Sequence, residues 1–357
     1  MNSVRFLWTV SELAFGDMVS IVLEGKPDKN LVLVTGRAHP KLAKDVANQL
    51  GIDVLETTAY DFANGEMYVR YTQSVRGTDV FVLQSHSDPV NKSIMEQLIM
   101  IDALKRASAR SITAVCPLLG YSRQDKKHRG REPISCRLMF DLLKTAGADR
   151  IMSVDLHAAQ SQGFFDGPVD HLIAMPVLVD YVRDRFSEDL GNVTVVSPDA
   201  GRIRVAEQWA QRLGGGPLAF VHKTRDITRP NQAVANRVVG DVAGRDCVMV
   251  DDLIDTAGTI AGACNVLKDA GAKSVTVVAT HGVLSGPAVE RLKNCGAREV
   301  VLTDTVPIPQ EKRWDGLTVL SIAPLLASAI KAVFEDGSVA KLFDTYPEHH
   351  GKGFLFA

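Results

Sequence analysis

The two halves of the chain carry similar segments, and this internal repetition limits the folds that the chain can adopt. Each copy has an apolar stretch ending in polar residues, a helical pattern and a second apolar stretch, and Ser111 of the first copy matches Ser274 of the second. The matching pairs are residues 31–51 with 193–214, 78–85 with 245–252, and 109–120 with 272–284. This repetition predicts two similar domains related by duplication.

The repeated unit alternates strand-like and helix-like patterns. Apolar runs such as residues 80–84 are typical of strands that helices cover on both faces, whereas residues 41–50 have the spacing of an amphipathic helix stopped by Gly51. We therefore predict an α/β protein with two tandem domains, each a mostly parallel sheet flanked by helices. Glycine, proline and aspartate cluster at residues 167–170. The expected division is an N-terminal extension (1–29), a first domain (30–168) and a second domain (169–357).

Charge and composition exclude several classes of partner. The 357 residues carry a net charge of -2, so the chain has no general attraction for nucleic acid or anionic membranes. No apolar run approaches the ~18 residues of a membrane span, and the N-terminus lacks the pattern of a secretory signal. We expect a cytoplasmic protein without nucleic-acid or membrane partners. The five cysteines are widely spaced without a C-x-x-C pair, which favours reduced, buried thiols.

Residues 248–259 (VMVDDLIDTAGT) change from apolar to acidic to small and polar. Asp251 and Asp252 follow a predicted buried strand at the carboxyl edge of a parallel sheet, where open α/β folds bind ligands. Such carboxylates accept hydrogen bonds from sugar hydroxyls or hold a divalent cation. Residues 255–259 then offer small side chains and the backbone N–H groups of a helix start, which favour an anion. The alternative is a pair of exposed loop acids with Thr259 as a helix cap.

Candidate metal ligands follow two other predicted strands. Asp155 and His157 lie two residues apart, so on an extended segment they face the same side. Asp166 and Asp170 follow in a glycine-rich stretch, and an oxygen-rich set with one imidazole suits magnesium better than zinc. Asp199 is the candidate for a second magnesium contact. The alternatives are helix-capping aspartates and a partly buried histidine.

Two cationic segments and one aromatic turn complete the set of candidates. Residues 222–230 (HKTRDITRP) are expected to form a lid that brings cations to a polyphosphate, with solvated surface as the alternative. Residues 121–131 (YSRQDKKHRGR) suit a nucleotide, RNA or water. Residues 61–66 (DFANGE) offer a ring for stacking and polar groups for base edges, although a turn around a core phenylalanine explains them equally well.

Together these strings resemble the ribose-phosphate diphosphokinases, the phosphoribosyl diphosphate synthetase family, over about residues 30–343. The resemblance implies two phosphoribosyltransferase-like domains. It also implies transfer of the diphosphoryl group of ATP to the 1-hydroxyl of ribose 5-phosphate, with release of AMP, for nucleotide biosynthesis. Further implications are a Mg²⁺ cofactor, a homo-oligomer, which is a hexamer in several members, and an effector site for ADP or phosphate near residues 74–77.

The resemblance also assigns roles to individual residues. It implies that ATP is contacted by Phe62, Asn64, Gly65 and Glu66 from one subunit and by Arg123 and Gln124 from another. Lys223 and Arg225 are the implied catalytic cations, and His157 and Asp199 the implied magnesium ligands. Ribose 5-phosphate is expected to contact Arg225, Asp251, Asp255, Thr256, Ala257, Gly258 and Thr259.

Two rival functions share parts of this pattern. A nucleobase phosphoribosyltransferase uses the same acidic loop, but it needs only one such domain and neither DFANGE nor RQDKK. A non-catalytic regulatory relative would lose the cationic lid or the acidic loop, and both are present here. One departure from the family is Leu118-Leu119-Gly120, where members usually have an aromatic, proline-rich run, which leaves the packing of the adenine pocket open.

Overall fold

The computed structural model describes residues 29–223 and 236–343. All but the last residue of the expected N-terminal extension, 1–29, lie outside these ranges. The strands are β1 (Leu31–Thr35), β2 (Thr57–Asp61), β3 (Met67–Tyr71), β4 (Asp79–Leu83), β5 (Ser111–Cys116), β6 (Arg150–Val154), β7 (Val169–Leu172), β8 (Val193–Ser197), β9 (Leu218–Lys223), β10 (Asn236–Val239), β11 (Asp246–Ile254), β12 (Ser274–Gly282), β13 (Glu299–Thr303) and β14 (Leu317–Leu320).

The helices alternate with the strands, as the repeated pattern predicts. The α-helices are α1 (Pro40–Leu50), α2 (Val90–Arg106), α3 (Ser135–Ala146), α4 (Met175–Arg185), α5 (Ile203–Arg212), α6 (Gly258–Asp269), α7 (Ala288–Asn294) and α8 (Ala323–Phe334). Short 3₁₀ helices are η1 (Ala159–Phe164), η2 (Leu190–Asn192), η3 (Ala200–Arg202), η4 (Gln310–Lys312) and η5 (Ala340–Leu342). Helix α1 ends as expected, with Gly51 in the left-handed region at φ 69°.

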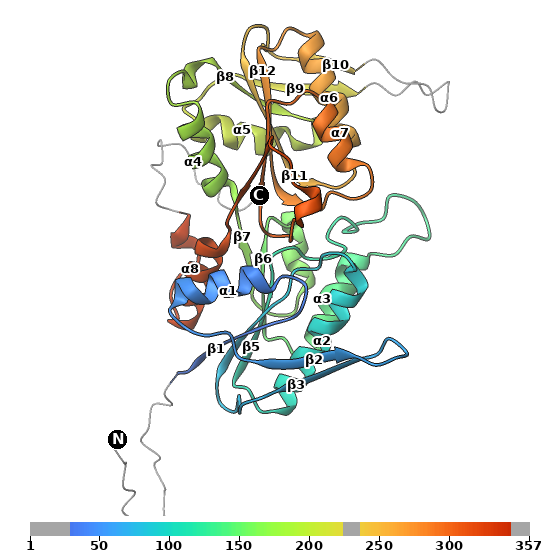
Figure 1. Cartoon of the computed structure of the whole chain (residues 1–357), viewed down its shortest axis with the longest axis vertical. Coiled ribbons are helices and arrows are strands. Elements are labelled where there is room, and N and C mark those ends of the chain that lie inside the picture. The colour runs from blue at the N-terminus through green and yellow to red at the C-terminus, as the bar shows by residue number, and fades with distance from the viewer. Residues whose placement is uncertain (1–28, 224–235, 344–357) are drawn as a thin grey trace, which may run out of the picture.

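The first sheet is parallel and has the strand order β1-β4-β5-β6-β7. Every residue of β4 is buried, and alternate residues enter different cores. Phe81 packs in the core that contains α1, while Val80 and Val82 pack in the core that contains α2 and α3. Strands β2 and β3 form a separate antiparallel hairpin beside this domain (Figure 1).

The second sheet has the order β10-β9-β8-β11-β12-β13-β14. Its pairings are parallel except for β10, which runs antiparallel to β9. Val248 packs with residues of α5 and α8, whereas Met249 packs with residues of α6 and α7. Helices therefore cover both faces, and the α/β fold class is confirmed.

The duplication is visible at the first residue of the two matching strands β4 and β11. Asp79 pairs in register with Ser111, and Asp246 pairs in register with Ser274. In the first domain, Ser111 Oγ and Arg110 Nε donate to Asp79 Oδ1 at 2.7 and 2.8 Å. In the second, Lys273 and Ser274 donate to Asp246 at 2.8 and 2.6 Å. The repeated D…(R/K)-S pattern therefore makes the same clamp between neighbouring strands twice.

The expected boundary after residue 168 is wrong, because β7 is the edge strand of the first sheet. The glycine and proline near residue 168 mark a turn into this strand. The chain also returns late to the first domain, since α8 packs against α1, and the two helices lie side by side in Figure 1. Leu42 of α1 and Leu326 of α8 belong to one buried cluster that continues into the second domain.

Candidate active site

The predicted anion loop lies at the carboxyl end of β11. Asp251 and Asp252 fall within the strand, which continues to Ile254, and the chain then turns through Asp255 into α6. Ala257 precedes the helix at φ 58°, and no side chain caps the helix start. The backbone N–H groups at the start of α6 therefore have the character of an anion site.

The adjacent carboxylates of Asp251 and Asp252 have opposite pKa shifts. Burial and the neighbouring Asp252 carboxylate raise the pKa of Asp251 to about 8. Burial also disfavours the charge of Asp252, but its hydrogen bond with His157 and the charge of Arg202 hold its pKa well below the ordinary value. Asp252 is thus the ionised member of the pair near neutral pH, and Asp251 retains a proton to a large extent.

His157 reaches this pair from the other domain. It follows β6 of the first sheet, and its Nδ1 lies 2.7 Å from Asp252 Oδ2. Arg202 enters the same cluster from η3, with Nη2 2.5 Å from Asp252 Oδ2. The two sheets therefore meet at a compact group of one imidazole, one guanidinium and two carboxylates. Arg202 was not among the residues predicted from the sequence, and only its position three residues after Asp199 pointed toward the site.

The other predicted metal ligands have separate partners. Asp199 accepts a hydrogen bond from Gly201 N at 2.8 Å, the capping role considered as an alternative. Asp155 does not converge with His157, because its carboxylate binds Thr280 Oγ1 at 2.6 Å and Ala174 N at 3.2 Å. Asp170 lies in β7 and pairs with Arg150 at 2.8 Å. In the part of the chain that the structure describes, no three His, Cys, Asp or Glu side chains are grouped to enclose a metal ion.

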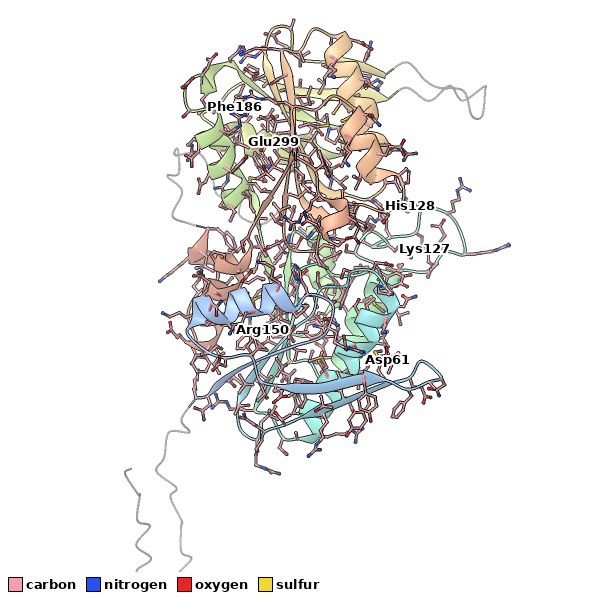
Figure 2. The ribbon with its side chains drawn as sticks, in the orientation of Figure 1. Asp61, Lys127, His128, Arg150, Phe186 and Glu299 are labelled. Carbon is pink, nitrogen blue, oxygen red and sulfur yellow. The ribbon has the colours of Figure 1, made fainter. Side chains whose placement is uncertain are left out.

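The basic segment of the first domain faces the anion loop of the second. Arg123 Nη2 donates to Asp255 Oδ2 at 2.8 Å. Burial raises the pKa of Asp255, but hydrogen bonds from Ser285 and Arg123 lower it further, so the net pKa lies below the ordinary value. Gln124 accepts from Ser135 Oγ at 2.7 Å and so supports the start of α3. Lys127 and His128 lie farther along on the projecting loop (Figure 2).

The DFANGE string forms the tip of the β2–β3 hairpin. Phe62 is 46% exposed, so the alternative of a core phenylalanine is wrong. Its ring lies 5.5 Å from that of Tyr60, which stacks on Tyr68 at 4.8 Å between centroids. Asn64 Oδ1 accepts from Glu66 N at 3.2 Å and shapes the tip. Asp61, labelled in Figure 2, holds the hairpin to the domain through Arg37 and Lys92.

Comparison with known proteins decides the family. Residues 31–147 match the N-terminal domain of ribose phosphate pyrophosphokinase, and residues 223–344 match the phosphoribosyl synthetase-associated domain. The ribose-phosphate pyrophosphokinase of Bifidobacterium longum is 92% identical over 340 residues, covering 95% of this chain and 100% of that protein. The chain belongs to the ribose-phosphate pyrophosphokinase family.

Other relatives agree with this membership. The ribose-phosphate pyrophosphokinase of Mycobacterium tuberculosis is 65% identical over 316 residues, which cover 88% of this chain and 96% of that protein. The crystal structure of phosphoribosylpyrophosphate synthetase from Mycobacterium smegmatis superposes with a TM-score of 0.82 at 62% identity, covering 87% of this chain and all of that chain. The predicted family, the enzyme class and its diphosphoryl transfer in nucleotide biosynthesis are thereby confirmed.

The family residues fall into two groups in this structure. The residues implied for ribose 5-phosphate at 251–259 lie at the carboxyl end of β11 and the start of α6, and Arg123, His157 and Asp199 lie in the segments that follow β5, β6 and β8. Lys223 is the last residue of β9 in the second sheet, and Arg225 lies outside the described residues. Within residues 29–223 and 236–343, none of the helices combines the length and apolar character that a membrane crossing requires. All five cysteines are buried and free, as expected.

Proposed function

We propose that this chain carries out the family reaction with the anion loop of the second domain and the basic segment of the first. In this reaction the 1-hydroxyl oxygen of ribose 5-phosphate attacks the β-phosphorus of ATP. The bond between the β-phosphorus and the bridging oxygen of the α-phosphate breaks, AMP leaves, and the hydroxyl proton is released. The ion pair between Arg123 and Asp255 carries the proposal, because it brings a segment assigned to ATP against the loop assigned to ribose 5-phosphate.

The roles of individual residues follow from their chemistry. The N–H groups at residues 256–259 bind the 5-phosphate at the start of α6. Asp251 orients the ribose hydroxyls, while Lys223, Arg225 and Arg123 neutralise charge on the transferred diphosphoryl group. Phosphoryl transfer needs positioning and charge neutralisation rather than a covalent partner, so these residues supply the types of group that the reaction requires.

The donor set fits magnesium, with His157 and Asp199 as the protein ligands. Magnesium usually binds through one or two protein groups together with substrate phosphates and waters, so a three-ligand cage is unnecessary. Asp199 offers its second carboxylate oxygen, because Oδ1 is the atom that accepts from Gly201. The metal ion supplies charge neutralisation at the phosphates when it is bound.

The exposed ring of Phe62 supports a site shared between subunits. An aromatic side chain with this exposure at a hairpin tip suits stacking on a base that another subunit holds. We therefore propose that the enzyme works as a homo-oligomer, with a hexamer as the expected state. Residues 74–77 are the proposed contact for ADP or phosphate as an effector, and the proposed location is the cytoplasm.

One assay tests the function against its rivals. ATP, ribose 5-phosphate and magnesium are supplied without a nucleobase, and AMP and phosphoribosyl diphosphate are measured together. Equal amounts of the two products are expected. A nucleobase phosphoribosyltransferase would form neither product, and a non-catalytic relative would bind ATP without turnover.

A further inference from the structure

Arg202 lies among three segments that the proposed function uses. It is the last residue of η3, the turn in which the Asp199 side chain accepts a hydrogen bond from Gly201 N–H. Its guanidinium approaches Asp252 Oδ2 at 2.5 Å and His157 Nδ1 at 2.8 Å, and its Nε lies 3.8 Å from Asp251 Oδ1. The side chain is 19% exposed, so the acidic pair and the segment carrying His157 largely enclose this cation.

The cation offsets the cost of placing an ionised carboxylate beside a second, buried carboxyl group. Asp251 and Asp252 are adjacent, and their side chains are 16% and 12% exposed. Ionised groups with so little water need a partner of opposite charge, and arginine remains charged in proteins. Since Arg202 lies closer to Asp252 than to Asp251, it stabilises the carboxylate that contacts His157.

The contacts at Nδ1 of His157 restrict the protonation of its ring. The arginine can only donate a hydrogen bond and the carboxylate of Asp252 can only accept one. If Nδ1 is bare, it accepts from Arg202 Nη2 at 2.8 Å, but its lone pair lies 2.7 Å from the charged Asp252 Oδ2. If Nδ1 carries the proton, the two donor nitrogens lie 2.8 Å apart, but both donate to Asp252 Oδ2. Hydrogen bonds to an ionised acceptor are the stronger ones, so the second arrangement is favoured.

We propose that Arg202 is a positioning residue for His157, acting through Asp252. Arg202 fixes the Asp252 carboxylate, and Asp252 holds the imidazole with Nδ1–H bound and the Nε2 lone pair directed to a divalent cation. This inference rests on the proposed role of His157 as a magnesium ligand. Histidine ligands usually donate their second N–H to a carboxylate, and loss of such a partner weakens metal affinity about 10–100-fold.

The arrangement also joins the two domains. His157 follows β6 of the first sheet, whereas Asp252 belongs to β11 and Arg202 to η3 of the second half. The metal ligand and the groups that orient it therefore come from different sheets. Arg202 and Asp252 thus tie the orientation of His157 to the contact between the two halves of the chain.

The first experiment measures metal binding directly. Mn²⁺ binding to the full chain is followed by electron paramagnetic resonance without nucleotide, for wild type, Arg202→Met and the control Arg204→Met. Arg204 is a matched control because it is exposed and lies two residues farther on. Arg202→Met is expected to bind Mn²⁺ about 10-fold more weakly. Equal affinity of Arg202→Met and wild type, or no binding by wild type, would overturn the proposal.

The second experiment reads the histidine ring itself. Protein labelled with ¹⁵N at the histidine side chains is studied by solid-state NMR, and His157→Gln identifies the signal of interest. Wild type is expected to show protonated Nδ1 and bare Nε2, with the tautomers mixed in Arg202→Met. Protonated Nε2 in wild type contradicts the inference.

A third variant separates positioning from folding. Arg202→Lys keeps the positive charge but loses the planar guanidinium group, so its affinity for Mn²⁺ should lie between those of wild type and Arg202→Met. If thermal melting shows that Arg202→Met is unfolded, Arg202→Lys takes its place in the comparison. If Arg202→Lys binds Mn²⁺ no more tightly than a folded Arg202→Met, the charge of Arg202 has no role in the metal site. Neither readout requires turnover, so failure of the proposed function, seen as absence of AMP formation, is distinguishable from failure of this inference.

Discussion

Arg123 and Asp255 lie 132 residues apart in the sequence and form an ion pair of 2.8 Å between the two domains. Their side chains are 53% and 27% exposed, so the pair is well hydrated. Exposed pairs of this kind contribute only ~0.2–1 kcal/mol to stability. The pair is therefore better explained by what each side chain does for a substrate than by its effect on the fold.

Substitution of this pair should affect catalysis more than stability. We expect Arg123→Ala to raise the KM for ATP and Asp255→Ala to raise the KM for ribose 5-phosphate, each lowering kcat/KM at least ~10-fold. The midpoint of urea unfolding should change little. Arg137→Ala is the control, because Arg137 forms an equally short ion pair with the more exposed Asp141 in α3. Loss of stability without loss of kcat/KM would make the pair structural.

Lys223 is expected to act on the transition state. Because its charge is proposed to meet the diphosphoryl group during transfer, Lys223→Ala should lower kcat about 100–1,000-fold and leave the affinity for ATP nearly unchanged. Single-turnover kinetics and equilibrium binding of ATP measure the two effects. Arg225→Ala should act in the same direction. Lys127→Ala, on the projecting loop, is the control and should retain full activity.

Sharing of the site between subunits predicts complementation. Phe62→Ala/Asn64→Ala removes the hairpin contacts to ATP, and Arg123→Ala removes those from the facing subunit. Each variant alone should have low activity. When the two variants are co-expressed and the interface is isologous, about half of the subunit pairs are mixed and each mixed pair has one intact site, so up to about a quarter of the sites should be active. Activity of isolated mixed oligomers is the measurement. No gain over the separate variants would place the hairpin and Arg123 in unconnected sites.

The metal requirement should exceed the amount bound by ATP. Because His157 and Asp199 are proposed to hold an ion, raising Mg²⁺ beyond the ATP concentration should continue to increase the rate. Initial rates at fixed ATP and increasing Mg²⁺ provide the measurement. A plateau at equimolar Mg²⁺ would exclude a catalytic ion on the protein.

The Asp79 clamp should contribute a pH-dependent part of the stability. Burial raises the pKa of Asp79, but hydrogen bonds from Arg110 and Ser111 outweigh it, so the folded-state pKa lies below the ordinary value. The stabilisation is therefore complete above the unfolded-state pKa and is lost as the pH falls through the lowered, folded-state value. Asp79→Asn should destabilise the chain by about 1.5–3 kcal/mol at pH 7.

Urea unfolding from pH 7 to pH 3 tests this prediction for Asp79. The difference in unfolding free energy between wild type and Asp79→Asn should shrink as the pH falls. Asp246→Asn should behave alike, because hydrogen bonds from Lys273 and Ser274 also outweigh burial and lower the pKa of Asp246. Asp141→Asn serves as the exposed control. If the difference in unfolding free energy did not change with pH, the effect of the substitution would come from packing alone.

Sequence by itself determined the features that depend on neighbouring residues. The buried strand before Asp251, the helix start at Gly258 and the end of α1 at Gly51 all follow from local apolar runs and turn-forming residues. The repetition also matched Ser111 with Ser274, and the structure shows that the two serines make equivalent hydrogen bonds to Asp79 and Asp246. Such patterns are readable because their geometry is fixed over a few residues.

Only the tertiary structure decided which distant segments meet. Strand β7 joins the first sheet and α8 packs on α1, although the turn signal at residues 167–170 suggested a division there. Likewise, no local pattern places Arg202 beside both Asp252 and His157. These contacts depend on how two separately formed sheets pack, and the free energy of that packing comes from a shared apolar core that is spread over many residues. No local pattern carries this information.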